Sequence, residues 1–398
     1  MPRVVILSPV SSHHGHVHVI PTERRSWFRR LAKLALFLIV VGVGIHIASP
    51  PRYEFPPAVP FSGDQWYDPY DADGEWLRSN FHAHSYAWGG VTNGEDPPEA
   101  VIATYRELGY DVYPLSNYQQ ILRPDPGEGV PLTAYEHGYG LIGNHHTVIG
   151  ADEVEWLEYS LPHTIHHKQQ LLDVLRANAP IVVINHPSRK DSFPVSDFSK
   201  LVGYNGMEIL TKRSRSREHW DAALSAGRAV WGYCADDGHD LSRTSNFAIG
   251  WNMILAADRT PEAVIDALRA GRFHGVWTRH KEEPNVLRSI GLADGTLSLA
   301  VERPADEIRF IGQDGRVLHA VQDADRASYE VQSGDTYVRA EAETGDTTLT
   351  FNPVFRHDGD PFAWEPAVVR PVATWVWRIG ALLAVAIVGW WMYLRRRA

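Results

Sequence analysis

The sequence is nearly without cysteine. Of its 398 residues only Cys234 is a cysteine, which excludes an intramolecular disulfide and the cysteine-rich zinc modules. Cys234 follows an apolar run, and we expect it to be a buried small residue rather than a nucleophile. Histidine, by contrast, occurs 20 times. Any metal site must therefore use nitrogen and carboxylate ligands, which suit zinc, manganese or iron.

Positive charge is scarce in the middle of the chain. Of the 38 Lys and Arg residues, six lie at positions 3–33 and four at 378–397, which leaves 28 between these end regions. The same middle part holds 47 of the 48 Asp and Glu residues, so its net charge is 28 − 47 = −19. A region this acidic repels a phosphate backbone, and we expect no nucleic-acid partner.

Two long apolar runs stand near the ends of the chain. Residues 31–49 follow a basic region and predict an uncleaved membrane helix. A cleaved signal peptide is the alternative, but the residues at 49–52 (Ser-Pro-Pro-Arg) do not form a small-x-small cleavage site. Residues 372–394 precede Arg395 to Arg397 and predict a second span. The alternative, a helix lying on the membrane surface, is disfavoured because residues 379–394 carry no charge.

Both apolar runs have their cations on the terminal side. The positive-inside rule then places both termini in the cytoplasm, and the acidic middle on the periplasmic or extracellular side of an inner or plasma membrane. The lipid bilayer is thus an expected partner. The predicted order is a cytoplasmic tail 1–30, a membrane helix 31–49, a Pro-rich linker 50–66, a β/α domain 67–284, a small antiparallel β domain 285–352, a linker 353–371, a membrane helix 372–394 and a basic tail 395–398.

The middle of the chain alternates short apolar runs with helical stretches. Strands are predicted at 112–115, 181–184, 206–210 and 229–233, and helices at 97–108, 168–177, 218–226 and 261–270. This alternation predicts a mostly parallel α/β layout, either a barrel or an open sheet. From 288 to 351, short alternating strands separated by Asp-Gly and Ser-Gly turns predict antiparallel β structure.

Polar, metal-competent residues follow several of the apolar runs. They include His82-Ala83-His84, Asn185-His186-Pro187 and Asp237-Gly238-His239. On a strand, residues i and i+2 point the same way, so two histidines at this spacing can meet one ion. Between these motifs lie Glu136 and the pair His145-His146, of which only one can face a site on the same side of a strand. The set predicts metal binding.

These motifs, in this order, resemble the PHP (polymerase and histidinol phosphatase) metallohydrolases. The resemblance runs from about residue 80 to 273: Asn80 to Ser85 resembles the family's first motif, Glu136 its bridging glutamate, and the other two motifs its internal His-Pro and closing Asp-x-His. The following β region, with Tyr337 to Glu341, resembles the branch named for CehA and McbA. The resemblance implies a distorted seven-stranded β/α barrel and metal-dependent hydrolysis.

The resemblance also implies a ligand set. One ion would be held by His82, His84, Glu136 and Asp237; a second would share Glu136 and add His186 and either His145 or His146. Residues 88–90 (Trp-Gly-Gly) and 116–118 (Ser-Asn-Tyr) stand where the family has ligands for a third ion, which leaves only His239 for it. This departure favours a centre of two divalent ions.

The expected function is a membrane-anchored hydrolase in which a metal-activated water attacks a phosphoester or a related ester or amide. The substrate would be a small anionic or ester molecule. His239, with Asp237, would act as acid or base, and Asp236 would orient a ligand. Glu208 is expected near the site but not on the metal, and Arg189 either binds an anionic group or is a solvated surface residue.

Two alternatives remain from the sequence. The degenerate second motif would fit a binding or scaffolding protein at the membrane that has lost catalysis. Hydrolysis of a carbamate or amide, as the named branch suggests, would differ only in the bond cleaved. The basic run 212–217 either contacts an anionic substrate or forms a solvated loop.

Overall fold

The structure is a computed structural model that describes residues 22–125, 127–140, 142–279 and 283–394. The described residues divide into two compact units, one formed by residues 22–49 with 375–394 and the other by those between 50 and 374. The predicted tails at 1–21 and 395–398 lie outside the described residues.

The terminal unit contains two helices, α1 (Thr22–Ala48) and most of α6 (Pro371–Leu394). Both contain a stretch long and apolar enough to cross a membrane, Arg30–Ala48 and Pro371–Leu394. Arg378 donates hydrogen bonds to the backbone oxygens of Ala48 (3.2 Å) and Ser49 (3.1 Å), which satisfies carbonyls at the carboxyl end of α1. A Cβ on Gly44 would lie 2.8 Å from Val385, so glycine allows the two helices to approach closely.

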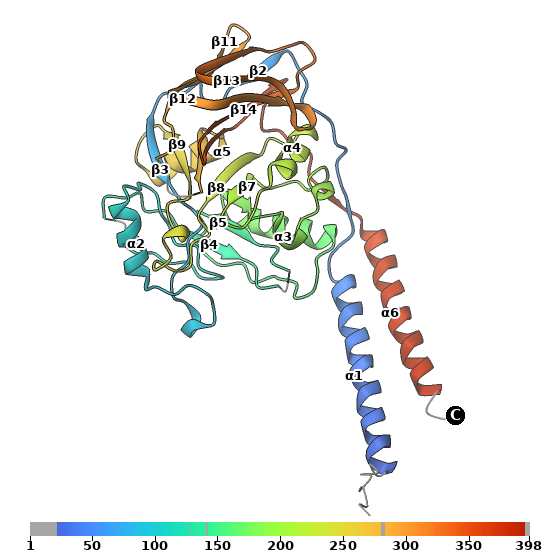
Figure 1. Cartoon of the computed structure of the whole chain (residues 1–398). Coiled ribbons are helices and arrows are strands. Elements are labelled where there is room, and N and C mark those ends of the chain that lie inside the picture. Colours follow the sequence, from blue (N-terminus) through green and yellow to red (C-terminus); the bar gives the residue numbers. More distant parts are fainter. Residues whose placement is uncertain (1–21, 126, 141, 280–282, 395–398) are drawn as a thin grey trace, which may run out of the picture. The chain divides into compact units, whose positions relative to one another are not determined.

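The central unit is a mixed α/β structure with two larger sheets and a two-stranded pair (Figure 1). The smaller sheet has the order β4-β5-β6-β7-β8, with parallel pairing only between β6 and β7 and between β7 and β8. Its strands are β4 (Ala134–His137), β5 (His146–Ile149), β6 (Ile181–Ile184), β7 (Gly206–Thr211) and β8 (Trp231–Ala235).

The larger sheet is antiparallel and has ten strands. They are β2 (Gln65–Tyr67), β3 (Glu75–Ser79), β9 (Gly250–Ala256), β10 (Phe273–Thr278), β11 (Leu287–Ala293), β12 (Thr296–Gly312), β13 (Arg316–Glu330), β14 (Tyr337–Thr344), β15 (Thr347–Phe351) and β16 (Val354–His357). A separate pair joins β1 (Tyr53–Glu54) to β17 (Val368–Val369).

Four helices accompany the two sheets: α2 (Pro98–Glu107), α3 (Ile165–Asn178), α4 (Arg217–Ser225) and α5 (Pro261–Arg269). Helix α3 packs on β6, α4 on β7, and α5 on β9 and β6. The strands of the smaller sheet are buried on both faces, and Trp220 and Trp231 lie in the core at 0% and 1% exposure. Continuous apolar runs are expected for strands that are covered on both sides.

A closed barrel is not confirmed, because the strand pairing divides these elements between two sheets. The predicted strand at 112–115 is wrong: only an isolated bridge joins Val112 to Ser79. Pro114 lacks the backbone N–H that a further ladder bond would need. The four helices predicted between 97 and 270 and the strands predicted at 181–184, 206–210 and 229–233 occur within three residues of their expected bounds, whereas α1 already begins at Thr22, ahead of the membrane helix predicted at 31–49.

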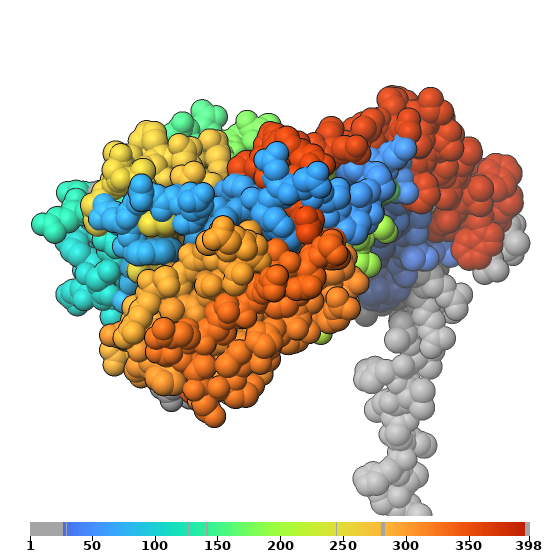
Figure 2. All heavy atoms as spheres, turned by 90° about the horizontal axis from the view of Figure 1, so that it is seen from above, coloured from blue at the N-terminus to red at the C-terminus, as the bar shows by residue number. Residues whose placement is uncertain are grey.

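The larger sheet connects the region of the predicted β/α domain to that of the predicted β domain. Strand β10 pairs with β15, with His274 opposite Phe351, and β9 joins β10 to β3. Figure 2 shows the early segment with β2 and β3, in blue, on the surface beside the later strands with which β2 and β3 pair. A division at residues 284 and 285 therefore stays a prediction, since one sheet continues across it.

Candidate metal centre

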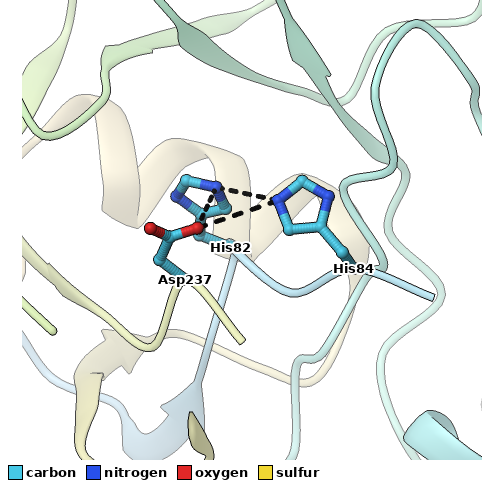
Figure 3. Close-up of side chains that lie close together, drawn as sticks. All are labelled: His82, His84 and Asp237. Carbon is cyan, nitrogen blue, oxygen red and sulfur yellow. Dashed lines mark hydrogen bonds and ion pairs between the residues drawn. The ribbon is translucent and has the colours of Figure 1, made fainter. Parts of the chain in front are cut away.

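The motif after β3 and the motif after β8 are joined by backbone hydrogen bonds. The N–H of His84 donates to the oxygen of Gly238 (2.8 Å), and the N–H of Asp237 donates to the oxygen of His82 (3.1 Å). This pairing brings His82, His84 and Asp237 together, as Figure 3 shows. Their donor atoms all lie within 4.8 Å of one another, and all three residues are buried.

The two imidazoles and the carboxylate converge on one point. The Nε2 atoms of His82 and His84 are 3.1 Å apart, and Oδ1 of Asp237 lies 3.4 Å from the first and 4.0 Å from the second. Two histidines and a carboxylate converging in this way are a common protein ligand set for a divalent transition metal.

Glu136, in β4, lies between two pairs of histidines. Its Oε2 is 3.3 Å from Nε2 of His82 and 3.0 Å from Nε2 of His84. Its Oε1 is 2.8 Å from Nδ1 of His145 and 3.5 Å from Nε2 of His186. Each carboxylate oxygen therefore faces a different pair, which is how a carboxylate shared by two ions would be placed.

The structure brings His145 to this centre and turns His146 away. His145 precedes β5, and its ring lies 5.3 Å from that of His186. His146 is the first residue of β5 and lies next to His137 and Phe193, with ring centroids 6.0 Å and 5.8 Å away. Because successive side chains alternate along a strand, only His145 faces Glu136. Of the two residues that the sequence left open, the geometry favours His145.

His239 and Tyr118 enclose His84 on its two sides. The ring of His239 stacks on that of His84 with centroids 4.2 Å apart, and Tyr118 stacks on it at 4.7 Å. Nε2 of His239 lies 2.9 Å from Oδ1 of Asp237. His239 thus touches a residue of the centre, in agreement with its expected position beside Asp237. From the sequence, Tyr118 was expected only to stand where related proteins have a metal ligand, and no role in the site was predicted for it.

Glu208, in β7, lies near the centre, as expected, and contacts two of its residues. Its Oε1 lies 2.6 Å from Nδ1 of His82, and its Oε2 accepts the backbone N–H of His186 (2.9 Å). A carboxylate on the far nitrogen of a metal-binding histidine fixes the tautomer and makes the other nitrogen a better ligand. Asn185 has a similar part, because its Nδ2 donates to Oε1 of Glu136 (3.0 Å).

Asp236 acts further from the centre than expected. Its carboxylate accepts hydrogen bonds from the backbone N–H groups of residues 248–250 and from Nδ2 of Asn80 (2.7 Å). Asn80 in turn accepts the N–H of His82 through Oδ1 (3.0 Å). Asp236 therefore holds the backbone that carries His82 and contacts no predicted ligand side chain in the bonds described.

Two residues of the centre have backbone conformations that side chains rarely adopt. His186 has φ of 31° and Asp237 has φ of 51°. Such conformations cost about 1–3 kcal/mol each and persist where the surrounding structure imposes them, often at functional sites. Here they coincide with the two motifs that follow β6 and β8.

Buried negative charge dominates the electrostatics. Burial alone would lower the pKa of His82, but Glu208, Glu136 and Asp237 raise it well above its usual value. Burial would raise the pKa of Glu136 and of Asp237, yet His82 and the neighbouring histidines hold both well below their usual range. Carboxylates buried this deeply require a compensating positive charge.

Several buried atoms of the centre have no hydrogen-bond partner. They include Oε2 of Glu136 and both ring nitrogens of His186, while Oδ2 of Asp237 makes an ion pair with Arg213. Unpaired buried polar atoms are costly, whereas lone pairs on these atoms are what a cation would bind. The residues present therefore fit one or two divalent ions with nitrogen and oxygen ligands.

Basic side chains stand at the edge of the centre. Nε of Arg213 lies 3.2 Å from Oδ2 of Asp237, and 29% of its side chain is exposed. Arg189, in a turn after the His-Pro motif, is half-buried, and its backbone N–H donates to the oxygen of His186 (2.8 Å). The sequence pointed to Arg189 and to the basic run 212–217, but no sequence signal singled out Arg213 within that run.

The chain has little similarity in sequence or structure to the known proteins with which it was compared. No family model matches the sequence, and no curated protein matches it. Among solved structures, one match is a two-domain protein containing a predicted PHP-like metal-dependent phosphoesterase from Bacteroides vulgatus. It is 11% identical, with a TM-score of 0.40 over 77% of this chain and 93% of that chain. Because this superposition is loose, the chemistry proposed below rests on the side chains of this protein.

Proposed function

We propose that the protein is a metal-dependent hydrolase of a phosphoester or a related ester or amide, with an active site of the PHP type and of the CehA/McbA-like branch. One observation carries the proposal: the carboxylate of Glu136 lies buried between two pairs of histidines, with Asp237 beside one pair. A carboxylate between two pairs of histidines can hold two ions in one site, and paired ions are used by hydrolytic enzymes.

Two groups of residues would hold the ions. His82, His84, Glu136 and Asp237 form one group, and Glu136, His145 and His186 form the other. When bound, divalent ions supply a water of lowered pKa and positive charge that stabilises the oxyanion of the transition state. The protein fixes these ligands through Glu208 and Asn185, which hold His82 and Glu136 in position.

His239 is the residue best placed to move a proton. Its side chain is 7% exposed, and its Nε2 contacts Oδ1 of Asp237 at 2.9 Å while its Nδ1 has no hydrogen-bond partner. An imidazole oriented by a carboxylate on one nitrogen can hold or give up a proton on the other. We propose that Nδ1 of His239 gives a proton to the leaving group.

The basic edge of the centre favours an anionic substrate. Arg213 lies at Asp237, and Arg189 stands in the turn whose backbone bonds to His186, so two arginines are near an otherwise acidic site. A guanidinium can bind phosphate or carboxylate oxygens in pairs. This favours a phosphoester over a neutral carbamate as the substrate.

We further propose that α1 and α6 anchor the protein in an inner or plasma membrane, with both termini in the cytoplasm and the catalytic unit on the other side. The apolar length of both helices and the basic residues on the terminal side of each apolar stretch support this arrangement.

Activity of the full-length protein in detergent tests the proposed chemistry. The protein is stripped with a chelator, reloaded separately with zinc, manganese or iron, and given an aryl phosphodiester, an aryl phosphomonoester and an aryl carbamate. We expect no hydrolysis without metal and hydrolysis of a phosphoester after reloading. Cleavage of the carbamate alone would move the assignment to that bond. Inactivity with every metal and substrate would favour the scaffold instead.

A further inference from the structure

A second group of buried histidines lies on the other face of the β4–β5 pair. His137 and His146 are direct partners across these two antiparallel strands, and both are fully buried. Residues opposite each other in such a pair project to the same side. Glu136 precedes His137 and His145 precedes His146, so the two faces of the pair carry two separate groups of potential ligands.

The segment between β5 and α3 adds a carboxylate and a third histidine. Oε1 of Glu158 lies 3.1 Å from Nε2 of His163, and Oε2 of Glu158 lies 3.8 Å from Nδ1 of His137. The side chains of Glu158 and His163 are 0% and 2% exposed. Two strands and one connecting segment therefore contribute to a single buried cluster, which we call the His146 cluster: His137, His146, Glu158 and His163.

Backbone hydrogen bonds fix where the protons lie. Nε2 of His137 donates to the oxygen of Leu157 (2.9 Å), and Nε2 of His163 donates to the oxygen of Tyr159 (2.8 Å). In a neutral imidazole only one nitrogen carries hydrogen, so Nδ1 of each ring holds a lone pair. A lone pair of His137 then faces an oxygen of Glu158, which is repulsive unless a positive charge lies between them. A histidine that donates its other N–H to a backbone carbonyl is the usual arrangement at a metal site.

Every member of the His146 cluster has a buried atom without a hydrogen-bond partner. These atoms are Nδ1 of His137, both ring nitrogens of His146, Oε2 of Glu158 and Nδ1 of His163. A buried polar atom left unpaired destabilises the fold, because it loses its hydrogen bonds to water and gains none in return. Five unpaired atoms in one cluster of four side chains indicate that the cluster binds something. Ring nitrogens and carboxylate oxygens are the donor atoms that bind a cation.

We propose that the His146 cluster binds a divalent transition-metal ion of the zinc class, in a structural site distinct from the Glu136 centre. Three nitrogens and one carboxylate oxygen match a closed four-coordinate zinc site. Within the described ranges, donor atoms converge within 4.8 Å only at the Glu136 centre. Ion binding at the His146 cluster would therefore bring its donor atoms closer together than they lie in this structure. The ion would tie the segment 150–164 to the strands that carry Glu136 and His145.

The test counts metal ions in full-length protein purified in detergent without chelators and equilibrated with zinc. Glu158→Gln removes the carboxylate at nearly constant volume, and His163→Gln removes a ligand from the connecting segment rather than from a strand. We expect each variant to hold one ion fewer per chain than the wild type. Glu153→Gln, an exposed carboxylate of the same segment, is the matched control and should keep the wild-type content.

A thermal measurement separates this site from the Glu136 centre. After chelation, added zinc should raise the Tm of Glu136→Gln, whose His146 cluster is intact, and raise it less in the double variant Glu136→Gln/Glu158→Gln. Equal metal content in the wild type, Glu158→Gln and His163→Gln would overturn the proposal, and so would equal zinc-dependent shifts in the single and double variants. Neither readout needs catalytic activity, so the proposal stands or falls independently of the proposed hydrolase.

Discussion

At the scale of single residues, the candidate centre is built from buried carboxylates that contact histidines. Glu136 faces four imidazoles, Asp237 faces three, and Glu208 holds the far side of His82. A carboxylate hydrogen-bonded to a histidine fixes the orientation of its ring, so removal of the carboxylate also disturbs the position of the histidine.

The first prediction concerns Glu208. Glu208→Gln removes the charge behind His82 at nearly constant volume, and we expect metal affinity at the centre to fall by roughly 10–100-fold while the fold is kept. Competition with a calibrated chelator measures this affinity. Glu218→Gln, an exposed glutamate of α4, is the control. Unchanged affinity in Glu208→Gln would show that the contact with His82 has no part in holding metal.

The second prediction concerns Arg213. If it binds an anionic group, Arg213→Gln should raise KM for the phosphoester by about tenfold, because a charge-assisted hydrogen bond is worth roughly 1.5 kcal/mol or more. The KM for a neutral carbamate should change little. Arg243→Gln, which removes an exposed arginine by the same substitution, is the matched control. An equal rise in KM for charged and neutral substrates would instead indicate that Arg213 only positions Asp237.

At the scale of elements, a buried ion-pair network joins α4 to β14. Nε of Arg339 lies 2.7 Å from Oδ1 of Asp221, and its Nη1 lies 2.6 Å from Oε1 of Glu341. Burial would raise the pKa of Glu341, but Arg339, and then Arg217 and Arg309, lower it to about 2. The network therefore holds α4, which packs on the smaller sheet, against β14 of the larger sheet.

The third prediction is the pH dependence of this network. Glu341 has a lower pKa in the folded than in the unfolded state, so its stabilisation is fully present above about pH 4.3 and is lost as the pH falls towards 2. Glu341→Gln should reduce the free energy of unfolding by about 3 kcal/mol at pH 7. The difference from wild type should shrink between pH 4.5 and 2. Urea unfolding at several pH values measures it, with Glu330→Gln, an exposed glutamate of β13, as control.

A difference between wild type and Glu341→Gln that stays constant down to pH 2 would contradict this prediction. It would mean that the carboxylate of Glu341 has an ordinary pKa in the folded protein.

The sequence predicted the elements that carry the centre better than it predicted their pairing. Strands β6 and β8 lack charged residues, and the motifs after them were recognisable because polar residues follow these apolar runs; β7 is mostly apolar but carries Glu208. Strand alternation could not choose between His145 and His146, because the first residue of β5 depends on tertiary pairing. Contacts such as Arg213 with Asp237 join segments far apart in sequence, and no local pattern contains them.

The large sheet was also beyond local patterns. The region 288–351 was correctly predicted as antiparallel strands, but nothing in its alternation indicates that β15 pairs with β10. Edge strands can accept any partner with free backbone groups, so the joining of two regions is decided by packing. For the same reason, a barrel expected from alternating strands and helices need not close.

At the scale of the whole molecule, two apolar helices stand at the ends of a chain whose middle is acidic. The fourth prediction is that a reporter fused at residue 20 and a reporter fused at the C-terminus both report a cytoplasmic location. A fusion placed in the β13 hairpin region, at exposed residue 314, should report the opposite side. A non-cytoplasmic signal from either terminus would contradict the two-anchor topology.

The most direct test of the Glu136 centre is the metal content of the wild type and Glu136→Gln, measured together by elemental mass spectrometry. Both are purified full-length in detergent without chelators, and circular dichroism checks that both are folded. Because the carboxylate of Glu136 faces both histidine pairs, we expect Glu136→Gln to hold two ions fewer per chain and to lose hydrolytic activity with them. Equal metal content in the two proteins would contradict the assignment of Glu136 as the residue shared by two ions.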